Sequence, residues 1–186
     1  MKKLMIAAAI VCAAALSQAA CIDWSVSNNA ILMSDGVSKP AKNTLVYLIN
    51  GDTALDTIAA AVSAGNISEQ NWFYGSAATD NTKGRISYNK VDAGTKLTVG
   101  QAYNFSALII DGDKYMLSGV QNQVAYKDGE EAMSVNFASD LFGANAQTAA
   151  LPGAQNGWAT AAVPEPTSGL LLLLGVAGLA LKRKRA

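Results

Sequence analysis

The chain has 186 residues, with 14 basic and 14 acidic side chains, two cysteines and no histidine. The lack of histidine excludes the commonest general base, the commonest zinc ligand and every catalytic triad built on an imidazole. Six basic residues lie near the two ends, so residues 20–162 carry eight basic and thirteen acidic side chains, a formal charge of −5. Such a region argues against nucleic acid as a partner, because Lys and Arg must neutralise phosphate.

Residues 1–19 have the three parts of a secretory signal peptide. Lys2 and Lys3 form a positive start, residues 4–16 are apolar and uncharged, and Ser17-Gln18-Ala19 is a small-x-small cleavage site. Ala20 is a second option for the last residue removed. We therefore expect export through the Sec machinery and cleavage by signal peptidase.

Cys21 is the one cysteine that remains after this cleavage, so no intramolecular disulfide is expected. Its position directly after a signal peptide also fits lipidation. Bacterial lipoproteins resemble one another in carrying Leu or a similar residue three positions before that cysteine, where this chain has Gln18. We favour an unmodified Cys21 and keep lipidation as the alternative.

Short runs of β-forming residues, separated by turn signals, predict a series of strands. The predicted strands are residues 22–26 (with 30–33 as a candidate continuation), 44–49, 85–91, 96–99, 103–110 and 114–117. The turn Asp111-Gly112-Asp113 predicts an antiparallel hairpin. The turn Asp128-Gly129-Glu130-Glu131 predicts a second hairpin, between residues 123–126 and 133–137.

Residues 53–64 are the one clear helix in the pattern. Thr53 is the candidate N-cap, Asp56 lies near the positive helix end, and Gly65 supplies the stop. Apolar residues recur at helical spacing. They are Leu55, Ile58 and Val62. The helix is therefore short and amphipathic, and suited to covering a sheet.

These elements predict a mainly β protein, an antiparallel β-sandwich of seven to nine strands with the helix as an insertion. An α+β sheet with the helix on one face is the alternative. The exported domain is expected over residues 20–142, with Leu141 and Phe142 docking onto its core. Residues 143–162, rich in Ala, Gly and Gln and including Pro152 and Trp158, are expected to be a linker.

Trp72, Phe73 and Tyr74 form the most aromatic point of the chain. In an extended strand two of them share one face and the third lies on the other. Aromatic side chains of this kind usually pack in a core, which is the interpretation we favour. The alternative is a glycan contact, in which the rings stack on sugars.

No catalytic, metal or cofactor site is expected. Asp111 and Asp113 resemble the start of a calcium loop, but the twelfth position is Asn122 and not Glu, so a turn is the better interpretation. A hydrolase with two carboxylates needs a pair facing each other across a cleft. The acidic residues lie mostly in turn-like sequence, which makes this the weakest hypothesis.

The C-terminal segment, residues 163–186, has three parts in a fixed order. The motif Val163, Pro164, Glu165 and Pro166 comes first, an apolar run follows at 169–181, and the basic residues Lys182, Arg183, Lys184 and Arg185 come last. The run is shorter than the about 20 residues that normally span a bilayer. The basic end is expected to stay cytoplasmic. The alternative is an ordinary C-terminal membrane anchor.

This order of motif, short apolar helix and basic end resembles the PEP-CTERM sorting signal of Gram-negative and related bacteria. The resemblance covers about 24 residues. It implies that the protein is exported, held transiently in the inner membrane, and recognised and cut near the motif by exosortase, a membrane transpeptidase. It also implies an association with the envelope, exopolysaccharide or biofilm matrix.

Together these features predict a structural protein of the envelope or extracellular matrix, with no catalytic activity of its own. The alternative is a carbohydrate- or exopolysaccharide-binding module.

Overall fold

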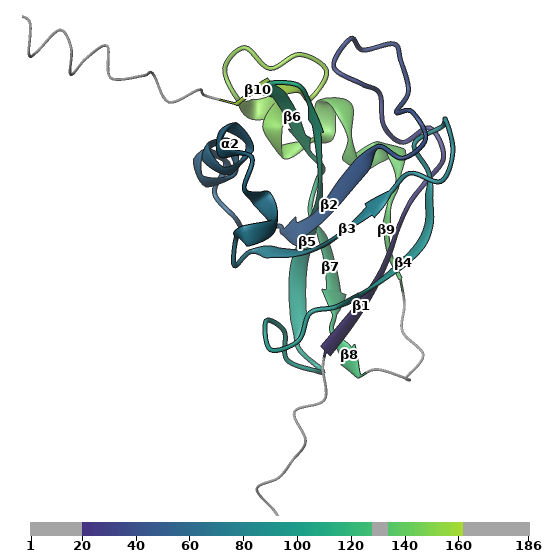
Figure 1. The fold of residues 1–186 in the computed structure, drawn as a ribbon, viewed down its shortest axis with the longest axis vertical. Helices are drawn as coiled ribbons and strands as arrows, with labels where there is room; N and C mark the ends of the chain where they lie inside the picture. Colours follow the sequence, from purple (N-terminus) through teal and green to yellow (C-terminus); the bar gives the residue numbers. More distant parts are fainter. Residues whose placement is uncertain (1–19, 128–133, 162–186) are drawn as a thin grey trace, which may run out of the picture.

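The computed structural model describes residues 20–127 and 134–161, which form two β-sheets and one α-helix (Figure 1). The four-stranded sheet contains β1 (Ala20–Val26), β4 (Ile86–Asp92), β8 (Tyr126–Lys127) and β9 (Val135–Phe137). The six-stranded sheet contains β2 (Leu45–Asn50), β3 (Phe73–Ala78), β5 (Ala102–Asp111), β6 (Lys114–Leu117), β7 (Gln121–Val124) and β10 (Ala159–Thr160). The helix is α2 (Leu55–Ala64).

Strand β1 is the centre of the four-stranded sheet. It pairs antiparallel with β4 along one edge, while its other edge is shared by β8, antiparallel, and β9, parallel. The predicted hairpin between residues 123–126 and 133–137 is therefore wrong. Strands β8 and β9 pair with successive parts of the same edge of β1, at residues 20–21 and 24–26, so they lie one after the other along β1 and not side by side. The predicted turn at 128–131 lies outside the described residues.

Strand β5 organises the six-stranded sheet. It pairs antiparallel with β2 at residues 105–109, while β7 at residues 102–105 and β6 at residues 108–111 share its other edge. The predicted hairpin is confirmed, with Asp111 opposite Lys114. Its two central residues are Gly112, which has a φ of 63°, and Asp113. The predicted strand at 44–49 is also confirmed as a central strand, with β5 on one side and β3 on the other.

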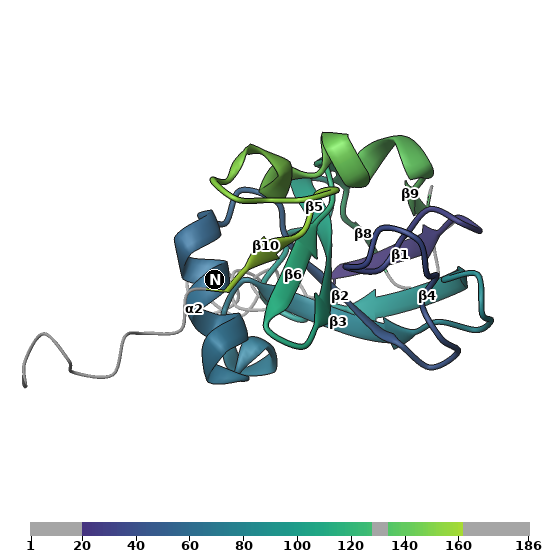
Figure 2. The same ribbon diagram turned by 90° about the horizontal axis from the view of Figure 1, so that it is seen from above.

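The two sheets face each other, so the predicted β-sandwich is confirmed. Strand alternation places Val46, Leu48 and Phe105 in a core shared with Ile22 and Trp24 of the four-stranded sheet. The residues between them point to the opposite face of the six-stranded sheet. There α2 and the 3₁₀ turn η1 (Ile67–Glu69) cover them, on the far side from β1 and β4 (Figure 2).

The N-cap of the helix lies one residue later than predicted. Ala54 is the N-cap residue and provides no side-chain cap, so Thr53 as N-cap is wrong. Thr53 instead belongs to the preceding turn, where its N–H donates to Asn50 O (3.2 Å). The predicted stop is confirmed, because Gly65 adopts the left-handed conformation and its N–H bonds to Ala61 and Val62 carbonyls.

Two short predicted strands are loops. The candidate continuation at 30–33 belongs to a loop over residues 27–39, in which Ala30 and Ile31 are buried although the segment pairs with no strand. Residues 96–99 form turns around the buried Leu97. In both places apolar side chains anchor a loop to the core, which a local pattern does not distinguish from a strand. The predicted strand at 85–91 is confirmed as β4.

The linker predicted at 143–162 is wrong for the residues that the structure describes. Residues 143–161 fold onto the domain through two 3₁₀ turns, η3 (Gly143–Asn145) and η4 (Gln147–Ala150), and through β10. Trp158 is 2% exposed, and its indole N–H donates to Leu32 O (2.9 Å). The packed domain therefore extends to Ala161 and does not end at residue 142, although Phe142 docks as predicted.

Cys21 lies in β1, between Asp92 of β4 and Tyr126 of β8, and is 1% exposed. This position favours burial over lipidation.

Candidate functional site

The three aromatic residues singled out in the sequence do not form an open stacking surface. Trp72 is 8% exposed and packs beneath α2, in the core on that face of the sheet. The Phe73 ring meets Tyr47 edge-on with a centroid distance of 6.3 Å. The Tyr74 ring packs on Phe105 at 5.4 Å, on the opposite face of the sheet. Most of the surface of all three rings is therefore buried against other side chains and is not open to a ligand.

The distribution of the rings also differs from the predicted alternation. Trp72 and Phe73 contact the helix-side core, while Tyr74 contacts the core between the sheets. The cause is a register shift between β2 and β3, because Leu48 pairs with Gly75 whereas Ile49 pairs with Phe73. A bulge of this kind places an extra residue on one strand and re-aims its side chains.

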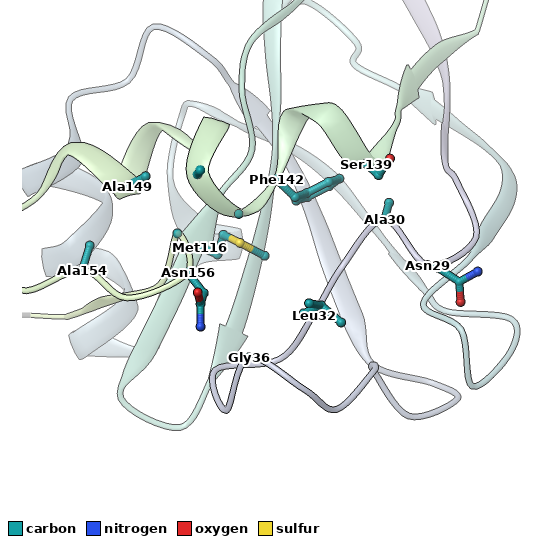
Figure 3. Close-up of a pocket in the computed structure, with 13 residues that line it drawn as sticks. Asn29, Ala30, Leu32, Gly36, Met116, Ser139, Phe142, Ala149, Ala154 and Asn156 are labelled. Atoms are coloured by element: carbon teal, nitrogen blue, oxygen red, sulfur yellow. The ribbon is translucent and has the colours of Figure 1, made fainter.

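The clearest cavity lies at one end of the sandwich, between the loop of residues 27–39 and the C-terminal residues 139–157 (Figure 3). We call it the inter-loop pocket. Its volume is about 530 Å³, and the side chains that shape it include Leu32, Met116, Phe142, Ala149, Ala154 and Asn156. This volume falls within the about 300–1,000 Å³ that small-molecule sites occupy.

Hydrogen bonds hold the loop wall of the pocket in place. Asp111 accepts two bonds from Ser34, one from its N–H (3.3 Å) and one from its hydroxyl (2.5 Å). The Trp158 indole binds Leu32 O on the side of the C-terminal segment. Asp111 is thus an anchor for this loop, which agrees with the turn interpretation and gives its carboxylate a structural partner.

The C-terminal wall is fixed by a tight turn. Asn156 and Gly157 have φ values of 52° and 83°, as in a type I′ turn, and Gln155 pairs with Trp158 across it. A side chain on Gly157 would collide with the carbonyl oxygen of Gly143. Asn-Gly is a strong local hairpin signal, so the sequence contained a sign of this element that the linker interpretation overlooked.

Polar groups lie at the rim of the inter-loop pocket, and its floor is apolar. Among the described residues, the Asn156 amide and the Ser139 hydroxyl have no hydrogen-bond partner, whereas Asn29 Oδ1 accepts from Lys39 Nζ (2.6 Å). Figure 3 shows Asn156 toward Gly36 and Asn29 at the opposite end, with the Met116 and Phe142 side chains between the two walls. No Asp, Glu, Lys or Arg is among the described residues that line the pocket.

A charged group lies just outside the pocket, in the turn of residues 35–38, which contains Gly36. Asp35 accepts bonds from the Ser38 hydroxyl and from the N–H groups of Val37 (2.9 Å) and Ser38 (2.7 Å). These bonds, first that from the Ser38 side chain, lower the pKa of the Asp35 carboxyl. The carboxylate therefore closes its own turn and is not directed at a ligand.

A second polar cluster lies on the four-stranded sheet. The pKa of Tyr126 is raised, first by burial and then by hydrogen bonding to Asp23, and hydrogen bonding to Asp23 is the main cause of the raised pKa of Tyr88. Asp23 Oδ1 is buried and, among the described residues, has no hydrogen-bond partner. Strands β4, β1 and β8 each supply one residue to this cluster, Tyr88, Asp23 and Tyr126.

Within residues 20–127 and 134–161, no three His, Cys, Asp or Glu side chains gather where a metal ion would bind. The same residues include no helix with the length and apolar character needed to cross a membrane.

Comparison with known protein families finds a match at the C-terminal end of the chain. Residues 162–185 match the sequence model of the PEP-CTERM protein-sorting motif. The match covers all the residues singled out in this segment, which are Val163, Pro164, Glu165 and Pro166, and Lys182, Arg183, Lys184 and Arg185. No curated protein and no solved structure matches the chain significantly.

The chain therefore carries a PEP-CTERM sorting motif, as the sequence predicted. The motif supports an exported protein that exosortase sorts to the envelope or surface. The motif and the signal peptide predicted at 1–19 both lie outside the described residues, so the described domain is the part of the protein between them.

Proposed function

We propose that this is a structural protein of the cell envelope or extracellular matrix, with no catalytic activity of its own. The observation that carries the proposal is the match of residues 162–185 to the PEP-CTERM motif. Exosortase recognises the motif and cleaves the chain near it. The domain of residues 20–161 is then the cargo that remains outside the inner membrane.

The two ends of the chain support a defined order of events. The Sec machinery exports the chain, and signal peptidase removes residues 1–19. Cleavage after Ala19 leaves β1 intact, including the bond from Ala93 N–H to Ala20 O (3.0 Å), whereas cleavage after Ala20 would remove that acceptor. The apolar run at 169–181 and the basic residues after it then hold the chain transiently in the inner membrane.

A second candidate function is binding of exopolysaccharide or another carbohydrate. The burial of Trp72 argues against the ring-stacking site considered from the sequence. What favours the function is a different feature, the uncharged inter-loop pocket with polar groups at its rim.

Mass spectrometry of the C-terminus tests the sorting proposal. The protein is isolated from surface and inner-membrane fractions of producing cells, with and without exosortase. We expect the surface form to lack Lys182 to Arg185, and the intact tail to accumulate in the membrane fraction when exosortase is absent. A control variant with Pro164, Glu165 and Pro166 replaced by alanine should behave like the strain without exosortase. Surface protein that retains the basic end would contradict the proposal.

A further inference from the structure

We propose that the inter-loop pocket binds one unit of an uncharged saccharide. The inference names a site for the carbohydrate-binding function considered above, and it does not depend on sorting by exosortase. Three properties of the pocket support it, which are its fixed walls, its uncharged lining and the solvent-exposed polar groups of Asn156 and Ser139 at its rim.

The pocket is formed before any ligand arrives. Its walls come from segments about 100 residues apart in the sequence, and the bond between Trp158 and Leu32 O joins them directly. The Thr148 hydroxyl donates to Gly157 O and accepts from Leu117 N–H (3.1 Å), which fixes the C-terminal wall to β6. A site held in this way loses little conformational entropy on binding.

The lining selects an uncharged ligand. A charged group placed here would lose its hydration without meeting an opposite charge among the described lining residues. Met116, which is 1% exposed, and Phe142, which is 4% exposed, form an apolar floor. The C–H face of a sugar ring suits such a surface, since it is the apolar side of an otherwise hydroxylated molecule.

The rim selects a hydroxylated ligand over a purely apolar one. The amide of Asn156 offers both donors and an acceptor, and the hydroxyl of Ser139 offers one donor and acceptor sites. An apolar occupant would cover these groups and leave them without partners, which is costly. Sugar hydroxyls can both donate to and accept from groups of these two kinds.

An extended peptide does not fit this site. Peptides that add to a sheet need an open strand edge. Of the described residues that line the pocket, Met116 is the one in a strand, and it pairs with Ile109 of β5. On the other edge of β6, Lys114 and Tyr115 pair with β10, and the Leu117 N–H donates to the Thr148 hydroxyl, so no open strand edge faces the pocket there.

The test is a titration followed by ¹H–¹⁵N spectra of the protein as secreted by producing cells. The probes are the methyl glycosides of glucose, galactose, mannose and N-acetylglucosamine. Each is added up to about 50 mM, because a single neutral ring with few hydrogen bonds should bind with a millimolar dissociation constant. For at least one glycoside we expect saturable shifts confined to residues 29–36, 116 and 139–157.

Two variants and a matched control locate the binding. Asn156→Gly removes the amide and tolerates the φ of 52°, and Ala149→Leu fills the pocket from the C-terminal wall. Each should raise the dissociation constant about fivefold or more. Asn156→Gly does so by removing a hydrogen bond to the ligand, and Ala149→Leu by occupying volume that the ligand needs. Asn43→Gly, at an exposed residue with a φ of 70° outside the pocket, should leave the constant unchanged. The spectra show whether each variant is folded.

Several results would overturn the proposal. These are no saturable shift with any glycoside, shifts that map elsewhere on the domain, or equal affinities in wild type and both pocket variants. Titration of the pocket by 1-butanol without any response to the glycosides would also overturn it, in favour of an apolar ligand. None of these results bears on cleavage of the tail by exosortase, which is measured separately.

Discussion

At the scale of single residues, Trp158 shows most directly that the C-terminal segment belongs to the fold. It is 2% exposed and bonds through its indole to Leu32 O. Trp158→Phe keeps most of the apolar surface and leaves that carbonyl without its donor. We expect it to lower the free energy of unfolding by about 1–2 kcal/mol, measured by urea denaturation.

Trp72→Phe is the matched control for this change. Trp72 is also buried, at 8% exposed, but its indole donates no hydrogen bond among the described residues. Its replacement should cost less than that of Trp158. If Trp158→Phe had no effect on stability, residues 143–161 would behave as the linker that the composition suggested.

Asp35 is the residue with the clearest acid dependence near the pocket. Its pKa lies below the usual value of 3.8, chiefly because the Ser38 hydroxyl donates to it. A lowered pKa in the folded state adds stability above the unfolded pKa, and this contribution is lost as the pH falls through the folded pKa. We therefore expect Ser38→Ala to weaken the loss of stability below about pH 4.

Urea midpoints of wild type and Ser38→Ala, measured from pH 6 downward, test this prediction. The two curves should differ most at pH 6 and converge in acid. A constant offset at every pH would mean that the Ser38 hydroxyl stabilises the loop independently of the charge on the Asp35 carboxylate.

At the scale of elements, two glycine turns in the C-terminal segment allow the cost of backbone strain to be measured apart from the cost of a steric clash. Gly153 and Gly157 have φ values of 79° and 83°, but a side chain at Gly153 would meet open space while one at Gly157 would strike Gly143 O. Gly153→Ala should cost about 1 kcal/mol, the strain of a left-handed alanine. Gly157→Ala should cost at least twice as much, and thermal or urea unfolding measures the difference.

Equal losses in the two variants would show that the turn at residues 155–158 moves freely against η3. The inter-loop pocket would then lack the fixed wall from which its saccharide specificity is argued.

The elements that could be predicted are those encoded by neighbouring residues. The β5–β6 hairpin followed from one turn between two β-forming runs, and the stop of α2 followed from Gly65. The parallel pairing of β9 with β1 could not be predicted, because it joins residues more than 100 positions apart and the local pattern carries no sign of direction. The face of Phe73 was missed because a bulge changes the alternation.

The candidate functional residues also fall into a group that could be predicted from the sequence and a group that could not. The sorting motif is a continuous stretch of sequence, so its residues were all visible. The inter-loop pocket is assembled from three distant segments, and Met116, Phe142 and Asn156 had no common pattern along the chain. The glycan contact considered at residues 72–74 rested on their aromatic composition. Whether a ring can reach a ligand depends on its burial, which composition does not show.

At the scale of the whole molecule, the domain ends almost at the sorting motif. Ala161 is 3% exposed, and its N–H donates to Asp113 O (2.8 Å), so one residue separates the packed domain from Val163. A chain extends by about 3.5 Å per residue, which leaves Pro164 to Pro166 within about 20 Å of the domain surface. We therefore expect exosortase to act close to the folded domain, without the spacer that the sequence suggested.

A longer spacer should then speed cleavage. We expect insertion of about six Gly and Ser residues after Ala161 to raise the rate at which the tail is removed, because a flexible segment lets the motif reach the enzyme independently of the domain. Pulse-labelling followed by mass analysis of the C-terminus measures that rate. The same insertion combined with alanine at Pro164, Glu165 and Pro166 should remain uncut, which controls for other proteases. An unchanged rate in the first variant would mean that exosortase accommodates the domain edge around β10 and Asp113 as it stands.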